Sequence, residues 1–261
     1  MTVYGVIGVG AISAAIVRGL CRAGQPGLPS TVLLSPRNAQ LAAELARQFS
    51  TVHVAESNQQ VVNGASVLLL CLRPQDAQAA LGTLTFRPGL KVVSVMAGLT
   101  VHTLAGLVTP VTDLARSIPL PAVEFGEGVT PLFPPSPAAS ALFGQLGTVI
   151  EVQDERTFEA LSASTATVAA LLKYLATVAA WLSGTGVPPS LASRYVAAVF
   201  SGVLTPLQTA VEVDFEKLTR EHQTLGGLNE QFLSVLEQAG IFSAVESGLH
   251  QVLKRLDSHQ G

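Results

Sequence analysis

A glycine-rich turn at the end of the first apolar segment constrains the fold of this chain more than any other feature. Residues 3–8, VYGVIG, have the composition of a buried strand, and residues 11–24, AISAAIVRGLCRAG, follow with a helical pattern that ends near Gly24. Gly8 and Gly10 stand at the junction, where the chain must turn tightly between strand and helix. A strand, a tight turn and a helix are the opening unit of a parallel α/β sheet.

The same alternation continues through the first half of the chain. Short strands joined by helices pair in parallel through right-handed crossovers. After Glu151 only long helical patterns occur, so the fold class changes there. We therefore expect an α/β doubly wound (Rossmann) parallel sheet in a domain of residues 1–152, followed by an all-α dimerisation domain of residues 153–261. The further expected strands are 31–35, 52–55, 66–72, 91–97, 111–117 and 147–152, and 39–50 is an expected helix.

Composition narrows the possible partners. The formal net charge is -3, only 13% of residues are charged, and no run of Lys or Arg occurs, so a nucleic-acid partner is not expected. Apolar residues make up 48% of the chain, which predicts surface hidden in a homodimer or a higher homo-oligomer. The five histidines have no metal-site spacing, although His222 lies where it could donate a proton.

One segment raises the question of a membrane. Residues 163–182 approach the length of a span, but Lys173 lies near the middle and three threonines accompany it. A helix buried between subunits is the favoured alternative, so no membrane contact is expected. The chain opens without a basic stretch or a cleavable signal pattern, which favours the cytoplasm. Cys21 and Cys71 lie in apolar segments and are expected to be reduced core residues.

The turn at Gly8 also predicts a cofactor. Gly8 permits the tight turn, Gly10 lets the backbone approach a pyrophosphate, and Ser13 is small enough to keep helix and strand close. The second strand ends in LLSPRN, where a site that prefers NAD would offer an acidic side chain to the ribose. Ser35 and Arg37 instead suit a 2'-phosphate. The sequence therefore predicts NADP(H), with NAD(H) possible.

Four stretches together resemble pyrroline-5-carboxylate reductase. They are IGVGAISAAI, LCLRPQ, SVMAGLT and RSIPLPAVEFGEGVT, which occur in the family's order and spacing. In LCLRPQ, Arg73 stands where the family has lysine. The resemblance implies an NADPH-dependent reductase of a small-molecule imine, with a helical domain that interlocks with its partner. The implied cofactor-binding residues are Ile7, Gly8, Gly10, Ala11, Ile12, Ser35, Arg37, Asn58, Leu72, Arg73, Pro74 and Ala97.

The resemblance also points to a substrate site around HQTLGGLNEQF. Gly226 and Gly227 fall on a family glycine pair and look like a turn whose bare backbone N–H groups could hold a substrate carboxylate. Thr224 falls on a family serine. Leu228 and Asn229 replace two threonines, the second of which is implicated in proton delivery. From another family motif, Ser162 and Ser164 are kept as a candidate catalytic residue and a candidate substrate contact.

The altered residues leave three hypotheses open. The first is NADPH-dependent reduction of a cyclic imine acid, with pyrroline-5-carboxylate as the leading candidate. The second keeps this chemistry but changes the substrate to another imine or a ketone. The third is a cofactor-binding sensor without turnover, because Asn229 can form hydrogen bonds but is no practical acid.

Overall fold

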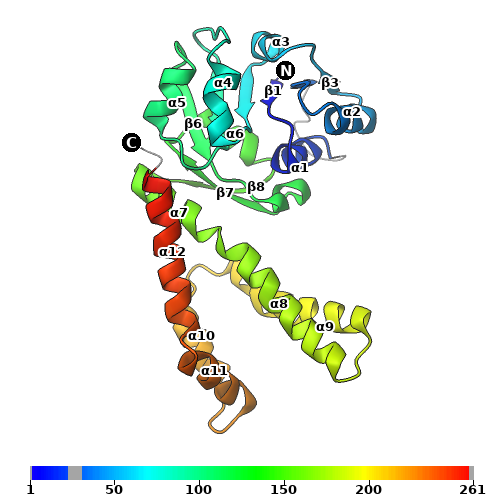
Figure 1. Cartoon of the computed structure of the whole chain (residues 1–261), viewed down its shortest axis with the longest axis vertical. Helices are drawn as coiled ribbons and strands as arrows, with labels where there is room; N and C mark the ends of the chain where they lie inside the picture. The colour runs from blue at the N-terminus through cyan, green and yellow to red at the C-terminus, as the bar shows by residue number, and fades with distance from the viewer. Residues whose placement is uncertain (1, 23–30, 259–261) are drawn as a thin grey trace. The chain divides into compact units, whose positions relative to one another are not determined.

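The computed structural model describes residues 2–22 and 31–258, and the chain divides into two compact units (Figure 1). The first comprises residues 1–163 with 253–261, and the second comprises residues 164–252. The expected domain boundary after residue 152 lies before helix α7 (Glu155–Ser164), nearly all of which belongs to the first unit. The expected helix end near Gly24 lies outside the described residues.

An eight-stranded sheet forms the centre of the first unit, in the order β3-β2-β1-β4-β5-β6-β7-β8. β1 pairs in parallel with both β2 and β4, so the strand order reverses direction beside β1. This confirms the doubly wound sheet. The strands are β1 (Val3–Ile7), β2 (Thr31–Leu34), β3 (Val52–Val54), β4 (Val67–Leu70), β5 (Lys91–Ser94), β6 (Asp113–Ser117), β7 (Gly128–Phe133) and β8 (Gly147–Glu151).

Helices cover both faces of this sheet. Successive residues of a strand point to opposite sides, and here both sides carry apolar side chains that must be buried. In β4, Leu69 packs with the cluster that includes side chains of α1, α2 and α6, while Leu68 and Leu70 pack with that of α3, α4 and α5. Burial on both sides explains the uninterrupted apolar sequence. The helices are α1 (Ala11–Leu20), α2 (Ala39–Gln48), α3 (Asn58–Gly64), α4 (Ala77–Leu81), α5 (Val101–Leu107) and α6 (Pro137–Phe143), with short 3-10 helices η1 (Pro74–Asp76) and η2 (Pro121–Phe125).

Strand β7 departs from the expected all-parallel sheet. It runs antiparallel to β6, with Ser117 opposite Leu132, and parallel to β8. The connection from β6 to β7 holds only η2, and a parallel crossover needs about a dozen residues or more, so the chain turns back instead. The sequence reading missed β7 because Pro131 interrupts its pattern and cannot donate a backbone hydrogen bond.

The second unit is all helical, as expected, but it has little core of its own. Among its described side chains only Ala192 and Val196 are buried apolar residues. An edge-to-face contact between Tyr174 and Phe200, with ring centroids 5.8 Å apart, joins its first two helices. Its elements are α8 (Thr167–Gly184), α9 (Pro189–Leu204), η3 (Thr205–Thr209), α10 (Phe215–Glu221), α11 (Leu228–Gln238) and most of α12 (Ile241–Ser258).

The apolar stretch of residues 163–182, which raised the question of a membrane, forms the end of α7 and most of α8. Within the described residues, the stretch Glu155–Gly184 is long and apolar enough to cross a membrane, by length and composition only. No residue of α8 is buried, and large apolar side chains such as Leu172 and Trp181 are exposed at 61% and 67%. This helix therefore presents an apolar surface that the second unit itself does not cover.

Candidate functional site

The phosphate loop between β1 and α1 depends on the missing side chain of Gly8. Gly8 has a φ of +95°, and a Cβ there would lie 2.4 Å from the carbonyl oxygen of Cys71. Both observations exclude an ordinary residue. The loop after β4 thus packs directly beneath the loop after β1.

The space above Gly10 is open. A Cβ built on Gly10 meets no atom within 4 Å, so backbone and ligand can approach closely at the start of α1. The Gly10 amide donates to Ser13 Oγ over 2.7 Å, which fixes the first turn. The first turn carries no acidic side chain, so the amides of Ala11 and Ile12 leave positive potential for a pyrophosphate. The loop therefore fits the predicted dinucleotide.

Two side chains from the loop after β2 support this turn. Ser35 Oγ accepts a hydrogen bond from the Gly8 amide at 3.0 Å, and Asn38 Nδ2 donates to the Val9 carbonyl oxygen at 3.0 Å. Ser35 is 1% exposed and its hydroxyl holds the loop, so its expected contact with a 2'-phosphate stays a prediction. Sequence reasoning missed Asn38, although asparagine before a helix is a common cap.

A cavity of about 660 Å³ opens beside Arg37. It brings Arg37 and Asn58 together, two residues predicted for the adenosine end of the cofactor. Ala79 and Ala80 of α4 form part of the wall, which leaves room for a flat base. The lining residues are Pro36, Arg37, Ser57, Asn58, Gln59, Ala79, Ala80, Thr83 and Leu84.

The other predicted cofactor residues lie in loops at the carboxyl edge of the sheet. Ile7 ends β1 and is buried, while Leu72 packs 3.1 Å from the position of a Cβ on Gly8. Arg73 precedes η1, which begins at Pro74. Ala97 is exposed just after β5. Doubly wound sheets bind ligands at their carboxyl edge, so the positions of these residues are consistent with a role in cofactor binding. Their individual contacts with a cofactor stay predictions.

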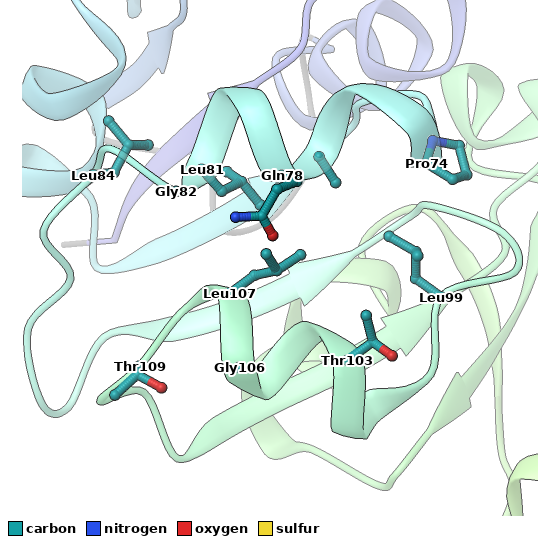
Figure 2. A pocket seen from close by; sticks show the side chains of 11 residues that line it. Pro74, Gln78, Leu81, Gly82, Leu84, Leu99, Thr103, Gly106, Leu107 and Thr109 are labelled. Atoms are coloured by element: carbon teal, nitrogen blue, oxygen red, sulfur yellow. The ribbon is translucent and has the colours of Figure 1, made fainter. Parts of the chain in front are cut away.

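A second cavity of about 520 Å³ lies between α4 and α5 (Figure 2). Pro74 and Leu99 lie at one end of it, while Gln78, Thr103 and Thr109 supply its polar side chains. None of the described residues that line this cavity is titratable, so they offer no acid or base. Its lining consists of Pro74, Ala77, Gln78, Leu81, Gly82, Leu84, Leu99, Thr103, Gly106, Leu107 and Thr109.

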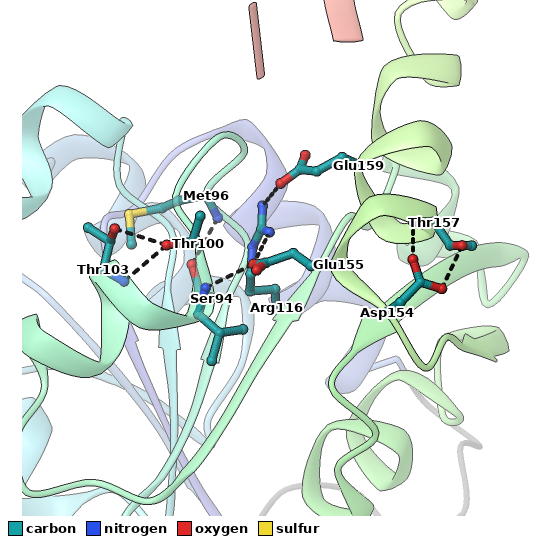
Figure 3. A network of polar contacts seen from close by, with 10 residues as sticks. Ser94, Met96, Thr100, Thr103, Arg116, Asp154, Glu155, Thr157 and Glu159 are labelled. Carbon is teal, nitrogen blue, oxygen red and sulfur yellow. Dashed lines mark hydrogen bonds and ion pairs between the residues drawn. The ribbon is translucent and has the colours of Figure 1, made fainter. Parts of the chain in front are cut away.

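A buried ion network lies beside the loop after β5 (Figure 3). The fully buried Arg116 places Nη1 2.7 Å from Glu155 Oε1 and Nη2 2.6 Å from Glu159 Oε1. Its guanidinium carbon lies 4.5 Å from the ring centroid of Phe158. Glu155 Oε1 also accepts the Val101 amide at 2.9 Å. One arginine therefore connects β6 and α7 and, through Glu155, the first turn of α5.

The two candidate serines lie at the end of α7. Ser162 is 6% exposed, whereas Ser164 is exposed. Asp154 caps this helix: its Oδ1 accepts the Thr157 amide at 2.8 Å, and this backbone hydrogen bond lowers the pKa of the Asp154 carboxyl. The proposed roles of both serines stay predictions.

The glycine turn before α11 is satisfied from within. Gly226 has a φ of +72°, and its amide donates to Glu230 Oε2 at 2.6 Å. The Gly227 amide donates to the Thr224 carbonyl oxygen at 2.7 Å. The expectation that these two backbone N–H groups are bare is therefore wrong in this structure, because an internal carboxylate and a carbonyl already accept from them.

The side chain of Asn229 is also engaged. Its Nδ2 donates to the His222 carbonyl oxygen at 2.9 Å and so joins α11 to the end of α10. His222 and Asn229 both line a mainly apolar cavity of about 550 Å³ with Leu218 and Leu233 among its walls. Leu228 beside them is 84% exposed. This cavity lies within the second unit and combines an amide and an imidazole with apolar walls.

Comparisons with known proteins found a family model and several relatives that this chain resembles. A family model described as NADP oxidoreductase, coenzyme F420-dependent, matches residues 3–98. A pyrroline-5-carboxylate reductase of Pseudomonas aeruginosa is 24% identical over 95% of this chain and 93% of its own length. Pyrroline-5-carboxylate reductase 1 of Bacillus spizizenii is 26% identical over 58% of this chain; that match spans 53%, about half, of the relative's length.

Solved structures have the same fold over nearly the whole chain. A 1-pyrroline-5-carboxylate reductase of Streptococcus pyogenes superposes with a TM-score of 0.83 at 22% identity, covering 98% of both chains. A Plasmodium falciparum pyrroline carboxylate reductase with NADP bound gives a TM-score of 0.82 at 14% identity, covering 100% of this chain and 98% of its own.

The buried ion network leads us to expect a large loss of stability when the Arg116 side chain loses its charge. Arg116→Met leaves Glu155 and Glu159 without their cation, so we expect the free energy of unfolding to fall by about 3–5 kcal/mol. Urea unfolding followed by circular dichroism measures the loss. Arg18→Met, which breaks the more exposed pairs with Glu44 and Glu124, is the control and should cost about 0–1 kcal/mol. Equal small losses in both variants would contradict this account of the network.

Cys71 lies beneath the phosphate loop, and we expect its thiol to be unreactive in the folded protein. Cys21 and Cys71 are both free and half-buried, and the burial of the Cys71 thiol raises its pKa to about 12. The neutral thiol stabilises the folded state below the ordinary thiol pKa, and this contribution is lost as pH rises toward 12. In a Cys21→Ser background at pH 8, a thiol reagent should label folded protein about a hundredfold or more slower than urea-unfolded protein. Similar rates would contradict this burial.

Proposed function

We propose that this chain, which resembles pyrroline-5-carboxylate reductases, reduces the C=N bond of a cyclic imine acid with NADPH, pyrroline-5-carboxylate being the leading substrate. The matched family model and relatives support an NAD(P)H-dependent oxidoreductase. The single observation that carries the proposal is the phosphate loop, where Gly8 requires the close approach of Cys71 and Gly10 leaves the start of α1 open.

Residues at the carboxyl edge of the sheet would hold the cofactor. The amides of Ala11 and Ile12 would bind the pyrophosphate, Arg37 would pair with the 2'-phosphate, and Asn58 would contact the adenine in the adjoining cavity. When bound, NADPH supplies a hydride for the imine carbon. The chain's contribution is to orient the two reactants, since the cofactor carries the difficult chemistry.

Proton supply is the step for which the chain has least provision. Asn229 Nδ2 already donates to the His222 carbonyl oxygen, so the amide has only its oxygen and one remaining N–H for a substrate. An imine that arrives protonated needs no acid from the protein. We propose that the amide oxygen of Asn229 accepts a hydrogen bond from such an iminium, with Thr224 and Leu228 as neighbouring contacts. The roles expected for Ser162 and Ser164 stay predictions.

A second candidate substrate is an imine or ketone without a carboxylate. The observation that favours it is the Glu230 carboxylate on the Gly226 amide, because a substrate carboxylate would have to displace an anion that is already part of the chain. The exposed Leu225 and Leu228, at 94% and 84%, add apolar surface on either side of the turn.

Turnover on a matched pair of imines tests this function. We expect loss of NADPH absorbance with pyrroline-5-carboxylate or with 1-pyrroline, which lacks the carboxylate, at about 1–1000 per second. Glu230→Gln should improve the ratio of kcat/KM for pyrroline-5-carboxylate over 1-pyrroline by about tenfold, because the internal anion is removed. Glu216→Gln, a carboxylate on exposed α10, is the matched control. Binding of NADPH without turnover on any imine or ketone would favour a sensor and contradict the reductase.

The uncovered surface of the helical unit favours a homodimer. Exposed large apolar residues lie on α8, α9 and α10, and a mainly apolar groove of about 820 Å³ runs between α8 and α12. Large exposed apolar patches mark association surfaces, and a second copy offers the same helices as complementary partners. We propose that the same face of a second copy, rather than a membrane, covers α8. We also propose that the enzyme acts in the cytoplasm. Leu172, Trp181, Tyr195 and Phe215 are each at least 60% exposed.

Light scattering tests the dimer. At micromolar concentration we expect about twice the 27.1 kDa mass of one chain, since this apolar area is too large to remain in water. Leu172→Glu should raise the dimer dissociation constant at least about tenfold by placing a charge in the interface. Lys173→Gln, at the neighbouring exposed position, controls for the change of charge on α8. A wild-type protein whose measured mass is that of one chain would contradict the proposal.

A further inference from the structure

Two arginines from different loops meet one carboxylate near the candidate cofactor site. Arg73, after β4, places Nε 3.1 Å and Nη2 3.0 Å from Asp76 Oδ2. Arg37, after β2, places Nη1 3.7 Å from the same oxygen. The side chain of Arg37 is 68% exposed and that of Arg73 is 70% exposed, whereas that of Asp76 is 25% exposed. The carboxylate thus lies partly buried between two cations that face solvent.

One member of this cluster, Arg37, lines the cavity of about 660 Å³. Among the described lining residues it is the single charged one, and the other wall begins at Ala79, three residues after Asp76. Asp76 does not cap α4 through its side chain. Its carboxylate therefore serves the arginines and not the helix.

The charges of the cluster suit a phosphate monoester better without Asp76 than with it. A phosphate monoester at neutral pH carries nearly two negative charges and three acceptor oxygens. Two guanidinium groups match it in charge and in hydrogen-bonding geometry. With Asp76 present the net charge of the three groups is only plus one, and the oxygen nearest both cations is already a carboxylate.

We propose that Asp76 sets the choice of cofactor: it competes with a ribose 2'-phosphate for Arg37 and Arg73 and so lowers the preference for NADPH over NADH. This inference rests on the proposed function, because it requires a dinucleotide in the site. The competing effect is that Asp76 holds the arginines in place for the phosphate. Exposed ion pairs contribute little to such ordering, whereas the carboxylate repels both charges of the phosphate, so repulsion decides the sign.

The test is a comparison of dissociation constants for NADPH and NADH, measured by cofactor fluorescence at low salt. Asp76→Asn should tighten NADPH binding about three- to tenfold and leave NADH binding within about twofold. Asp76→Ala should have the same two effects. In Arg37→Ala the gain from Asp76→Asn should shrink to less than about twofold, since one of the two cations is gone. Glu56→Gln, an exposed carboxyl in the loop before α3, controls for a general change of charge.

The outcomes separate this inference from the function on which it rests. A selective gain for NADPH that depends on Arg37 supports the role of Asp76. Unchanged or weaker NADPH binding in Asp76→Asn, with tight binding in the wild type, overturns the inference and leaves the reductase intact. A wild-type protein that binds neither dinucleotide overturns both.

Discussion

The close contact between Gly8 and the carbonyl oxygen of Cys71 is the constraint on which the cofactor half depends. With no Cβ at Gly8, the loops after β1 and β4 lie against each other, and the Ser35 hydroxyl can reach the Gly8 amide. The same packing brings the start of α1 to the open carboxyl edge of the sheet, where strand order reverses. A side chain at Gly8 would separate these loops and displace every group proposed to hold the dinucleotide.

The helical half depends on a different kind of contact. Its glycine turn gives its amides to Glu230 and Thr224, and Asn229 gives its Nδ2 to the end of α10. The turn is therefore ordered by its own groups. We infer that the chain keeps the cofactor chemistry of the reductases it resembles and has altered the substrate end, where Leu228 and the amide of Asn229 stand in place of two hydroxyl groups.

Much of the sheet could be predicted because strands such as VLLL of β4 are buried on both faces and stand between clear helical patterns. β7 could not, since its antiparallel direction follows from a short connection and Pro131 breaks its pattern. Gly8, Arg37 and Asn58 were identified from motif and resemblance, and the last two line one cavity. The partners of Ser35 and Arg116 could not be predicted, because they come from residues far apart in the sequence that only the folded chain brings together.

The most direct test of the central claim is transfer of deuterium from NADPH labelled at C4 of the nicotinamide. The protein would be incubated with the labelled cofactor and with pyrroline-5-carboxylate or 1-pyrroline, and the cyclic amine would be analysed by mass spectrometry. The account predicts one deuterium at the former imine carbon of at least one product, from one face of the nicotinamide only. Tight NADPH binding with no deuterium in either amine would contradict it.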